Sequence, residues 1–276
     1  MADTLGDEQR RLAQLALEAL GADGFALAGS GAIREHGLIH RPTQDIDLFT
    51  VHDAQDRFTT AFDRLVGHLR GHGYVVEIGR TLPGFAALMV TSPSGVSIGV
   101  DMGVDWREQA PVQLDVGPVL ALEDAVGNKV AALFSRGEAR DYLDVDAIRC
   151  SGKYTDAQIY ELGARADAGL TLDYFAMRLD QAAQLRPEHV AEYHVSSEQL
   201  EQLRQRMAAW AAQIRQSAEA LAEIDPRAVR AAKTGMLAMP QTTTSHGTVA
   251  SAEQNDDIGL PAQVTETQGR MPTLGV

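Results

Sequence analysis

The sequence predicts an α+β protein in which a mixed sheet with flanking helices precedes a helical domain and a disordered tail. Three observations support this. Apolar β-like runs alternate with amphipathic segments up to about residue 119, only helical periodicity follows, and the last 41 residues are rich in Thr, Ser, Gln, Gly and Pro. We therefore expect domains at 1–119 and 120–235 and a disordered tail at 236–276. A chain of 276 residues is long enough for two domains that each bury a core.

In the first part, apolar residues recur at helical spacing in two segments, 7–20 and 54–69. Short apolar runs predict strands at 25–28, 45–50, 74–78, 86–91 and 96–102. The segment 91–95 (TSPSG) has the residues of a hairpin turn, so the last two strands should be antiparallel neighbours. In the second part, helical periodicity predicts helices at 122–135, 141–149, 155–165, 171–184, 197–222 and 226–235.

The composition, 45% hydrophobic and 22% charged, is that of a globular protein. No run of about 18 apolar residues and no export signal is present, so neither a membrane span nor export is expected. A single cysteine, Cys150, excludes an internal disulfide and a cysteine-based zinc site. These features predict a cytoplasmic protein.

The formal net charge of −14 means that the chain as a whole would repel a polyanion such as nucleic acid. Two local groups of basic residues interrupt this acidity, Arg34 with His36, His40 and Arg41, and Arg136 with Arg140. We interpret each of these arginines, taken singly, as a solvated surface residue.

Asp45 and Asp47 are candidate metal ligands. Side chains two positions apart in a strand point to the same face, so both carboxylates would project together while Ile46 and Leu48 enter the core. Adjacent carboxylates repel each other unless a proton or a cation neutralises them. Carboxylate oxygens suit Mg²⁺, which also binds substrate phosphates. The pair therefore predicts a magnesium site.

A candidate phosphate-binding turn precedes this pair. The predicted strand at 25–28 ends in Gly29-Ser30-Gly31, and a helix is expected at 32–38. A strand, a turn of small residues and a helix leave backbone N–H groups and a hydroxyl facing an anion. Together with the two carboxylates, Gly29 and Ser30 predict a site for a nucleoside triphosphate and a metal ion.

Asp101 is a candidate third metal ligand. It follows the apolar run 96–100, on a strand that would lie beside the strand with Asp45 and Asp47. The alternative interpretation is an aspartate in a turn at the end of the strand.

Lys129 lies in the middle of the apolar stripe of the predicted helix at 122–135, four residues from both Ala125 and Leu133. An ammonium in this position either contacts an anion or extends along its apolar stem to water. Because the other candidates form an anion site, we expect Lys129 to contact a triphosphate.

The segment 140–144 (RDYLD) opens the next predicted helix. Asp141 lies in the first turn, where a carboxylate stabilises the helix dipole. Asp144 lies one turn further along and is a candidate to accept a proton from an attacking hydroxyl or to orient Lys129. A simple ion pair between Arg140 and Asp144 is the alternative.

These motifs together resemble the AbiEii/MenT nucleotidyltransferase toxins, a family of the polymerase-β-like nucleotidyltransferase superfamily. The resemblance extends over roughly residues 10–150. The motifs that carry it are Leu27-Ala-Gly29-Ser30, Arg41-Pro-Thr43-Gln-Asp45-Ile-Asp47-Leu-Phe49, Lys129 and Arg140-Asp141-Tyr-Leu-Asp144. The Gly-Ser and Asp-x-Asp elements occur across the superfamily, and their combination with Arg-x-Thr and Arg-Asp-x-x-Asp narrows the resemblance to this family.

The resemblance implies a nucleotidyltransferase-like sheet and a role for each motif residue. The implied catalytic residues are Asp45, Asp47, Lys129 and Asp144, the implied nucleotide-binding residues are Gly29, Ser30 and Lys129, and the implied metal ligands are Asp45, Asp47 and Asp101. The implied reaction is the Mg²⁺-dependent transfer of NMP from an NTP to an RNA acceptor such as the 3′ end of tRNA, with release of pyrophosphate. The implied partner is a cognate antitoxin protein.

Two other functions stay open. One is a nucleotidyltransferase that modifies a small molecule such as an aminoglycoside, because an acidic surface attracts a cationic acceptor. The other is a non-catalytic nucleotide-binding or protein-interaction module with the same fold. The sequence alone leaves the base of the NTP, the acceptor and the oligomeric state open.

Overall fold

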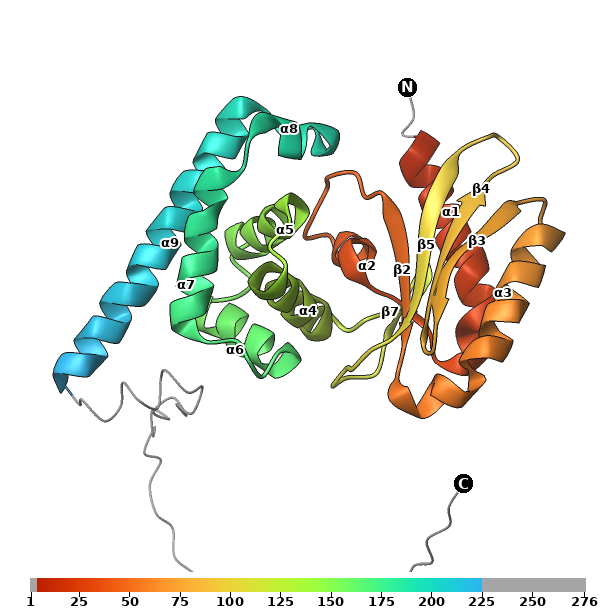
Figure 1. Ribbon diagram of the computed structural model, residues 1–276, viewed down its shortest axis with the longest axis horizontal. Helices are drawn as coiled ribbons and strands as arrows, with labels where there is room; N and C mark the ends of the chain where they lie inside the picture. The colour runs from red at the N-terminus through yellow and green to blue at the C-terminus, as the bar shows by residue number, and fades with distance from the viewer. Residues whose placement is uncertain (1–3, 225–276) are drawn as a thin grey trace, which may run out of the picture. The chain divides into compact units, whose positions relative to one another are not determined.

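The structure, a computed structural model, describes residues 4–224 (Figure 1). These residues belong to one compact unit. The helix predicted at 226–235 and the tail predicted at 236–276 lie outside the described residues. The domain boundary after residue 119 stays a prediction.

The strands of residues 4–224 form a seven-stranded mixed sheet of order β3-β4-β5-β2-β1-β7-β6. The strands are β1 Ala26–Leu27, β2 Asp45–Thr50, β3 Val75–Leu82, β4 Phe85–Thr91, β5 Ser97–Val104, β6 Val112–Leu114 and β7 Gly117–Val119. All five predicted strands are confirmed, with ends that differ by up to four residues. The short strands β6 and β7 were not predicted, because three residues are too few to show an alternating pattern.

The pairing of the strands determines which candidate residues meet. β4 and β5 are antiparallel neighbours joined through the turn at 91–95, as predicted. β5 also runs parallel to β2, and this pairing sets Asp101 directly opposite Asp47. Residues paired in this way point to the same face of a sheet. The expectation that Asp101 lies on a strand beside Asp47 is therefore confirmed.

The two faces of β2 differ in burial. Ile46 and Leu48 are buried, whereas the side chains of Asp45, Asp47 and Phe49 are half-buried on the opposite face. The helices α1 (Thr4–Leu20) and α3 (Phe58–Gly71) lie on the side of the sheet away from α2 and α4 (Figure 1). The helix predicted at 54–69 begins instead with a 3₁₀ segment, His52–Arg57, before α3.

Helix α2 spans Gly29–Glu35, so the expected boundaries of 32–38 were wrong by three residues at each end. The helix begins directly at Gly29, whose φ of +56° turns the chain sharply out of β1. It ends before Gly37, which has a φ of +75°. Ser30 therefore belongs to the first turn of the helix and not to a preceding loop.

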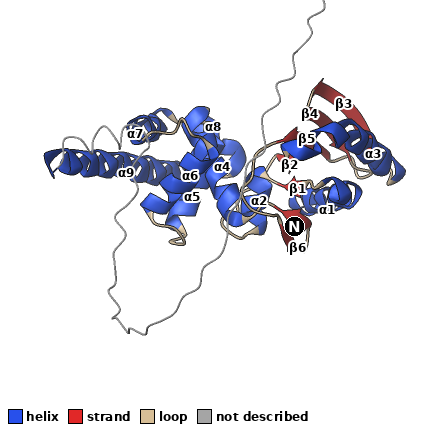
Figure 2. Cartoon of the chain, turned by 90° about the horizontal axis from the view of Figure 1, so that it is seen from below, coloured by secondary structure: helices blue, strands red, loops and turns tan. Residues whose placement is uncertain are grey.

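The rest of the described chain is helical, as predicted. The helices are α4 Leu122–Ser135, α5 Ala139–Cys150, α6 Asp156–Ala166, α7 Leu172–Asp180, α8 Pro187–Val190 and α9 Ser197–Ile224. The predicted helix at 171–184 divides into α7 and a 3₁₀ segment, and the four-residue α8 was not predicted. Figure 2 shows these helices beside the part that contains the sheet. Among residues 4–224, no helix is both long and apolar enough to cross a membrane.

Candidate active site

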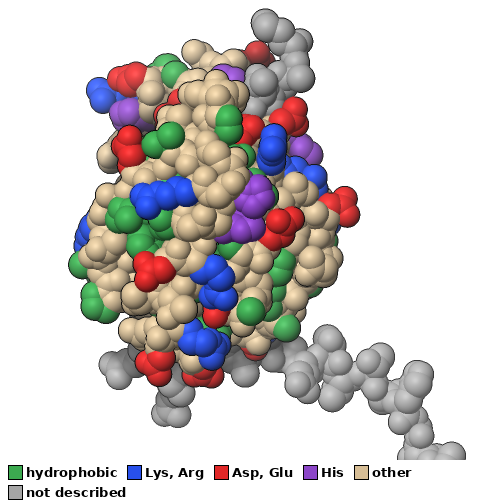
Figure 3. Space-filling view, turned by 90° about the vertical axis from the view of Figure 1, so that its right-hand side faces the viewer, with side chains coloured by type: hydrophobic (Ala, Val, Ile, Leu, Met, Phe, Trp, Pro, Cys, Tyr) green, Lys and Arg blue, Asp and Glu red, His purple; other side chains and the backbone are tan. Residues whose placement is uncertain are grey.

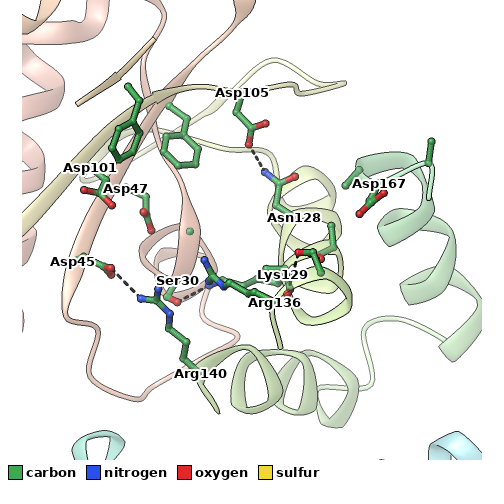
Figure 4. A pocket seen from close by; sticks show the side chains of 18 residues that line it. Ser30, Asp45, Asp47, Asp101, Asp105, Asn128, Lys129, Arg136, Arg140 and Asp167 are labelled. Atoms are coloured by element: carbon green, nitrogen blue, oxygen red, sulfur yellow. Dashed lines mark hydrogen bonds and ion pairs between the residues drawn. The ribbon is translucent and has the colours of Figure 1, made fainter. Parts of the chain in front are cut away.

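Three carboxylates lie on the face of the sheet opposite α1 and α3. Asp45 and Asp47 project from β2, and Asp101 projects from β5 opposite Asp47. All three line one pocket (Figure 4). The strand geometry thus brings the predicted metal ligands to one wall of the site.

The turn at Gly29 lies in close contact with this wall. A Cβ atom added to Gly29 would lie 1.7 Å from Oδ2 of Asp47, and the backbone there has a positive φ. The N–H of Ala28 also donates to the carbonyl of Asp47 over 2.8 Å. Position 29 therefore requires glycine both for its backbone conformation and for its contact with Asp47.

The carboxylates perturb one another. Burial raises the pKa of Asp47 to about 6, with further raising by the charges of Asp45 and Asp101 and partial opposition by Lys129. Burial, followed by the charge of Asp45, also raises the pKa of Asp101. This is the electrostatic state expected of acidic side chains that a cation normally neutralises.

The donor set fits a divalent cation. Asp45 and Asp47 supply hard oxygen ligands from one strand face, and Mg²⁺ commonly takes only one or two carboxylates, completing its shell with water and substrate phosphate. Within residues 4–224, no three His, Cys, Asp or Glu side chains form a ready-made metal-binding group. The fit therefore rests on the pair from β2, with Asp101 next to it.

Lys129 of α4 is buried, and its ammonium contacts an anion. Its Nζ donates to Oγ of Ser30 over 2.7 Å and lies 3.0 Å from Oδ2 of Asp144. The alternative that Lys129 extends to water is therefore wrong, since the residue is only 5% exposed. Its contact with a triphosphate stays a prediction.

Asp144 of α5 is fully buried and hydrogen-bonded through both oxygens. Arg41 donates to Oδ1 and Oδ2 over 2.7 and 2.8 Å, and Oγ of Ser30 donates to Oδ2 over 2.8 Å. Burial by itself would raise the pKa of Asp144, but the charges of Lys129 and Arg41 hold it below its ordinary value. Asp144 is thus a buried carboxylate held in its charged form.

Arg41 is not a solvated surface residue. Its side chain is about 10% exposed, and its guanidinium also donates to Oγ of Ser30 over 2.8 Å and lies 4.8 Å from the ring centroid of Tyr193. Thr43, two residues on, is anchored to α1 because its hydroxyl donates to Gln9 over 3.1 Å. The Arg-x-Thr motif therefore fixes the segment before Asp45, because Arg41 contacts Ser30 and Asp144 while Thr43 contacts α1.

Arg140 and Arg136 also belong to the site. The alternative interpretation, an ion pair between Arg140 and Asp144, is wrong. Arg140 instead donates to Oδ2 of Asp45 over 3.0 Å. Arg136 forms two 2.9 Å hydrogen bonds with Asp141, which also forms a capping box with Glu138. Arg136 follows the end of α4 and Arg140 lies in the first turn of α5, so no helical spacing in the sequence could have placed both beside the carboxylates.

The pocket formed by these residues has a volume of about 570 Å³, which is typical of a small-molecule site. Figure 4 shows Asp45, Asp47 and Asp101 along one side, with Arg136 and Arg140 below. Further lining residues did not enter the predicted site: Phe49, Phe85, Asp105, Asn128, Ala131, Ala132, Ser135, Ala166, Asp167 and Ala168. Most of them come from elements far apart in the sequence, so no local pattern unites them.

Comparison with protein families identifies the chain. The family described as "Nucleotidyl transferase AbiEii toxin, Type IV TA system" matches residues 10–234. This chain belongs to the AbiEii family of nucleotidyltransferase toxins. It is therefore an enzyme, a nucleotidyltransferase, and the family implies a nucleotide substrate and an antitoxin partner. The alternative of a non-catalytic module is set aside.

The solved structure of MenT4 shows the same kind of fold. MenT4, a nucleotidyltransferase toxin from Mycobacterium tuberculosis H37Rv, aligns with a TM-score of 0.50 and 16% identity over 84% of this chain and 93% of its own. JHP933 from Helicobacter pylori aligns with a TM-score of 0.48 and 17% identity over 83% of this chain and 100% of its own. No curated protein matches the sequence. The resemblance and the predicted fold class are confirmed.

Proposed function

We propose that this enzyme transfers NMP from an NTP to an RNA acceptor, such as the 3′ end of a tRNA, in a Mg²⁺-dependent reaction. The observation that supports this is a single pocket in which Asp45 and Asp47 face the cationic side chains of Lys129, Arg136 and Arg140. Enzymes that transfer phosphoryl or nucleotidyl groups use carboxylates to hold the metal ion and cationic side chains to contact the polyphosphate.

In the proposed reaction, the acceptor hydroxyl oxygen attacks the α-phosphorus, and the bond to the β-phosphate oxygen breaks, so that pyrophosphate leaves. Lys129 and the turn at Gly29 and Ser30 would neutralise the charge that develops on the leaving group. Asp45 and Asp47, with Asp101 beside them, would hold the divalent cation, which polarises the α-phosphate and lowers the pKa of the acceptor hydroxyl.

For Asp144 we propose a positioning role. Both of its oxygens already accept hydrogen bonds, and it is fully buried, so an acceptor hydroxyl has no access to it. Its lowered pKa also makes it a poor proton acceptor. Asp144 instead holds Lys129 and Ser30 in the direction of the pocket.

The net charge of −14 opposes the long-range approach of a polyanion such as RNA. The face that carries α3 shows acidic and basic side chains interspersed (Figure 3). The same net charge favours a cationic acceptor such as an aminoglycoside as the second candidate. Parallel incubations with total RNA and with amino sugars distinguish them by the size of the labelled product.

The family implies an antitoxin, and we propose that a cognate antitoxin limits this activity in the cytoplasm. The single cysteine, Cys150, is consistent with a reducing compartment. Co-expression with the antitoxin should restore growth to cells in which this enzyme stops it.

The decisive experiment uses Asp47→Ala with each labelled NTP, Mg²⁺ and total RNA. Wild type should label an RNA and the variant should not, because half of the carboxylate pair is gone. The matched control is Asp53→Ala, which removes an exposed carboxylate outside the site and should leave the labelling unchanged. Chelation by EDTA should abolish the wild-type reaction. Equal labelling by wild type and Asp47→Ala would overturn the proposal.

A further inference from the structure

The pocket has a second end, which is lined by aromatic side chains. Asp45, Asp47 and Phe49 alternate along one face of β2, and the pairing of the strands places Phe49 and Phe85 on either side of Gly103. Both phenylalanines are partly exposed and line the same pocket as the carboxylates. We call these three residues the Phe49–Gly103–Phe85 row.

Gly103 determines the position of one ring. A Cβ atom added there would lie 3.0 Å from both Cδ1 and Cε1 of Phe49, so the ring of Phe49 lies against the Cα of Gly103. Two strand spacings separate Phe49 from Phe85, about 10 Å between their Cα atoms. The row therefore presents two aromatic side chains to the pocket with only a glycine between them.

Polar side chains lie beyond this row. Asp105 follows the end of β5, and Nδ2 of Asn128 from α4 lies 3.5 Å from its Oδ2. Figure 4 shows Asp105 and Asn128 at the upper end of the pocket, away from Arg136 and Arg140 at the lower end. An amide and a carboxylate together offer both donor and acceptor groups, whereas the lower end offers mainly cations.

The pocket thus has two chemically different ends, one for an anion and one for a planar, polar-edged group. A nucleotide has the same two parts. We propose that Phe49 and Phe85 bind the face of a nucleobase while Asn128 and Asp105 hydrogen-bond to its edge, an inference that rests on the proposed function. The base belongs either to the incoming NTP or to the terminal nucleotide of the acceptor, and both share this chemistry.

The test measures the binding of two probes by calorimetry in the presence of Mg²⁺. One is each of the four NTPs as a non-hydrolysable α,β-methylene analogue, and the other is inorganic triphosphate, which has no base. For Phe49→Leu and Phe85→Leu, the Kd of the preferred NTP analogue should rise about tenfold, as loss of a stacked base predicts. The Kd of triphosphate should stay within about twofold of wild type, which also shows that the variants are folded.

The control is Tyr174→Leu, which removes an exposed aromatic ring on α7 outside this pocket. It should change neither Kd. Asn128→Ala should reduce the differences in affinity among the four analogues, because it removes a group that contacts the edge of the base.

The same variants identify the source of the base. If the NTP affinity is unchanged but the KM for the acceptor rises about tenfold in both phenylalanine variants, the row binds the acceptor base. Unchanged NTP affinity together with unchanged acceptor KM overturns the proposal. An equal loss of affinity for NTP and triphosphate also overturns it, since the effect is then independent of a base. Failure of the proposed function would appear differently, as absence of labelled product from wild type.

Discussion

Asp144 illustrates at the scale of a residue how one buried charge organises the site. Its carboxylate accepts hydrogen bonds from Arg41 and Ser30 and lies 3.0 Å from the ammonium of Lys129. A buried ion of one sign is costly unless the other sign is in contact with it. Asp144 therefore stabilises the two cations and, through them, keeps the hydroxyl of Ser30 in place.

Replacing Asp144 with Asn should lower the free energy of unfolding by about 3–5 kcal/mol, because Lys129 and Arg41 stay buried without a matching negative charge. Urea denaturation at pH 7 measures this. The control is Asp156→Asn, which breaks a 2.7 Å ion pair with Arg149. Because the side chain of Asp156 is 42% exposed, this change should lower the free energy of unfolding by less than about 1 kcal/mol. Equal losses for the two variants would contradict the buried-charge explanation.

The same comparison has a pH dependence. The pKa of Asp144 in the folded protein lies below its ordinary value of 3.8, so its carboxylate contributes stability above about pH 4. That contribution is lost as the pH falls through the folded-state pKa. The stability difference between wild type and Asp144→Asn should therefore shrink as the pH is lowered below 4.

At the scale of elements, the close approach of α4 and α6 determines one wall of the pocket. A Cβ atom on Gly127 would lie 2.7 Å from the carbonyl oxygen of Leu162, and one on Gly163 would lie 2.4 Å from Cγ1 of Val130. Both helices therefore depend on glycine where they meet. The end of α6 then brings Asp167 to the lining of the pocket.

Two helical glycines should respond to alanine with opposite signs. Gly163→Ala should destabilise the protein by about 1–3 kcal/mol, because the new methyl group forces α6 away from α4. A Cβ atom on Gly67 of α3 would have no neighbouring atom within 4 Å. Gly67→Ala should therefore stabilise the protein by up to about 1 kcal/mol, because alanine favours a helix. Urea denaturation measures both. Stabilisation by Gly163→Ala would show that the helices separate at no cost.

At the scale of the molecule, the site is assembled from distant parts of the chain. Tyr193, which follows α8, lies over the guanidinium of Arg41, and Arg140 of α5 contacts Asp45 of β2. The helical part therefore supplies cations and a cover to the carboxylates of the sheet. Neither part alone contains the pocket.

The contact between Tyr193 and Arg41 predicts that the ring matters and the hydroxyl does not. Tyr193→Phe should keep the rate of nucleotide transfer within about twofold of wild type, whereas Tyr193→Leu should lower the unfolding free energy by about 1–2 kcal/mol and slow transfer. Denaturation and initial rates measure the two effects. Tyr174→Leu, at a 64% exposed position on α7, is the control and should change neither. Slow nucleotide transfer by Tyr193→Phe would show that the hydroxyl, and not the ring alone, contributes to the rate.

The elements of this protein follow largely from local patterns. The alternation in 45–50 predicted β2 and the shared face of Asp45 and Asp47. The apolar stripe of 122–135 predicted α4 with the boundaries that the structure has. Both patterns depend on residues a few positions apart, so they are present in the sequence alone. The start of α2 was misplaced, because a glycine that can begin a helix also resembles a turn.

The sequence by itself thus determined the fold class, the longer helices and strands, and the family motifs, whereas the short elements β6, β7 and α8 were not predicted. Only the tertiary structure decided that Asp101 lies opposite Asp47, that Arg41 and Arg140 belong to the site, and that Asp144 is buried. The physical reason is that a strand pairing or an ion pair joins residues far apart in the sequence. Periodicity carries no information about such contacts, so it does not show whether an arginine faces solvent or a partner from a distant element.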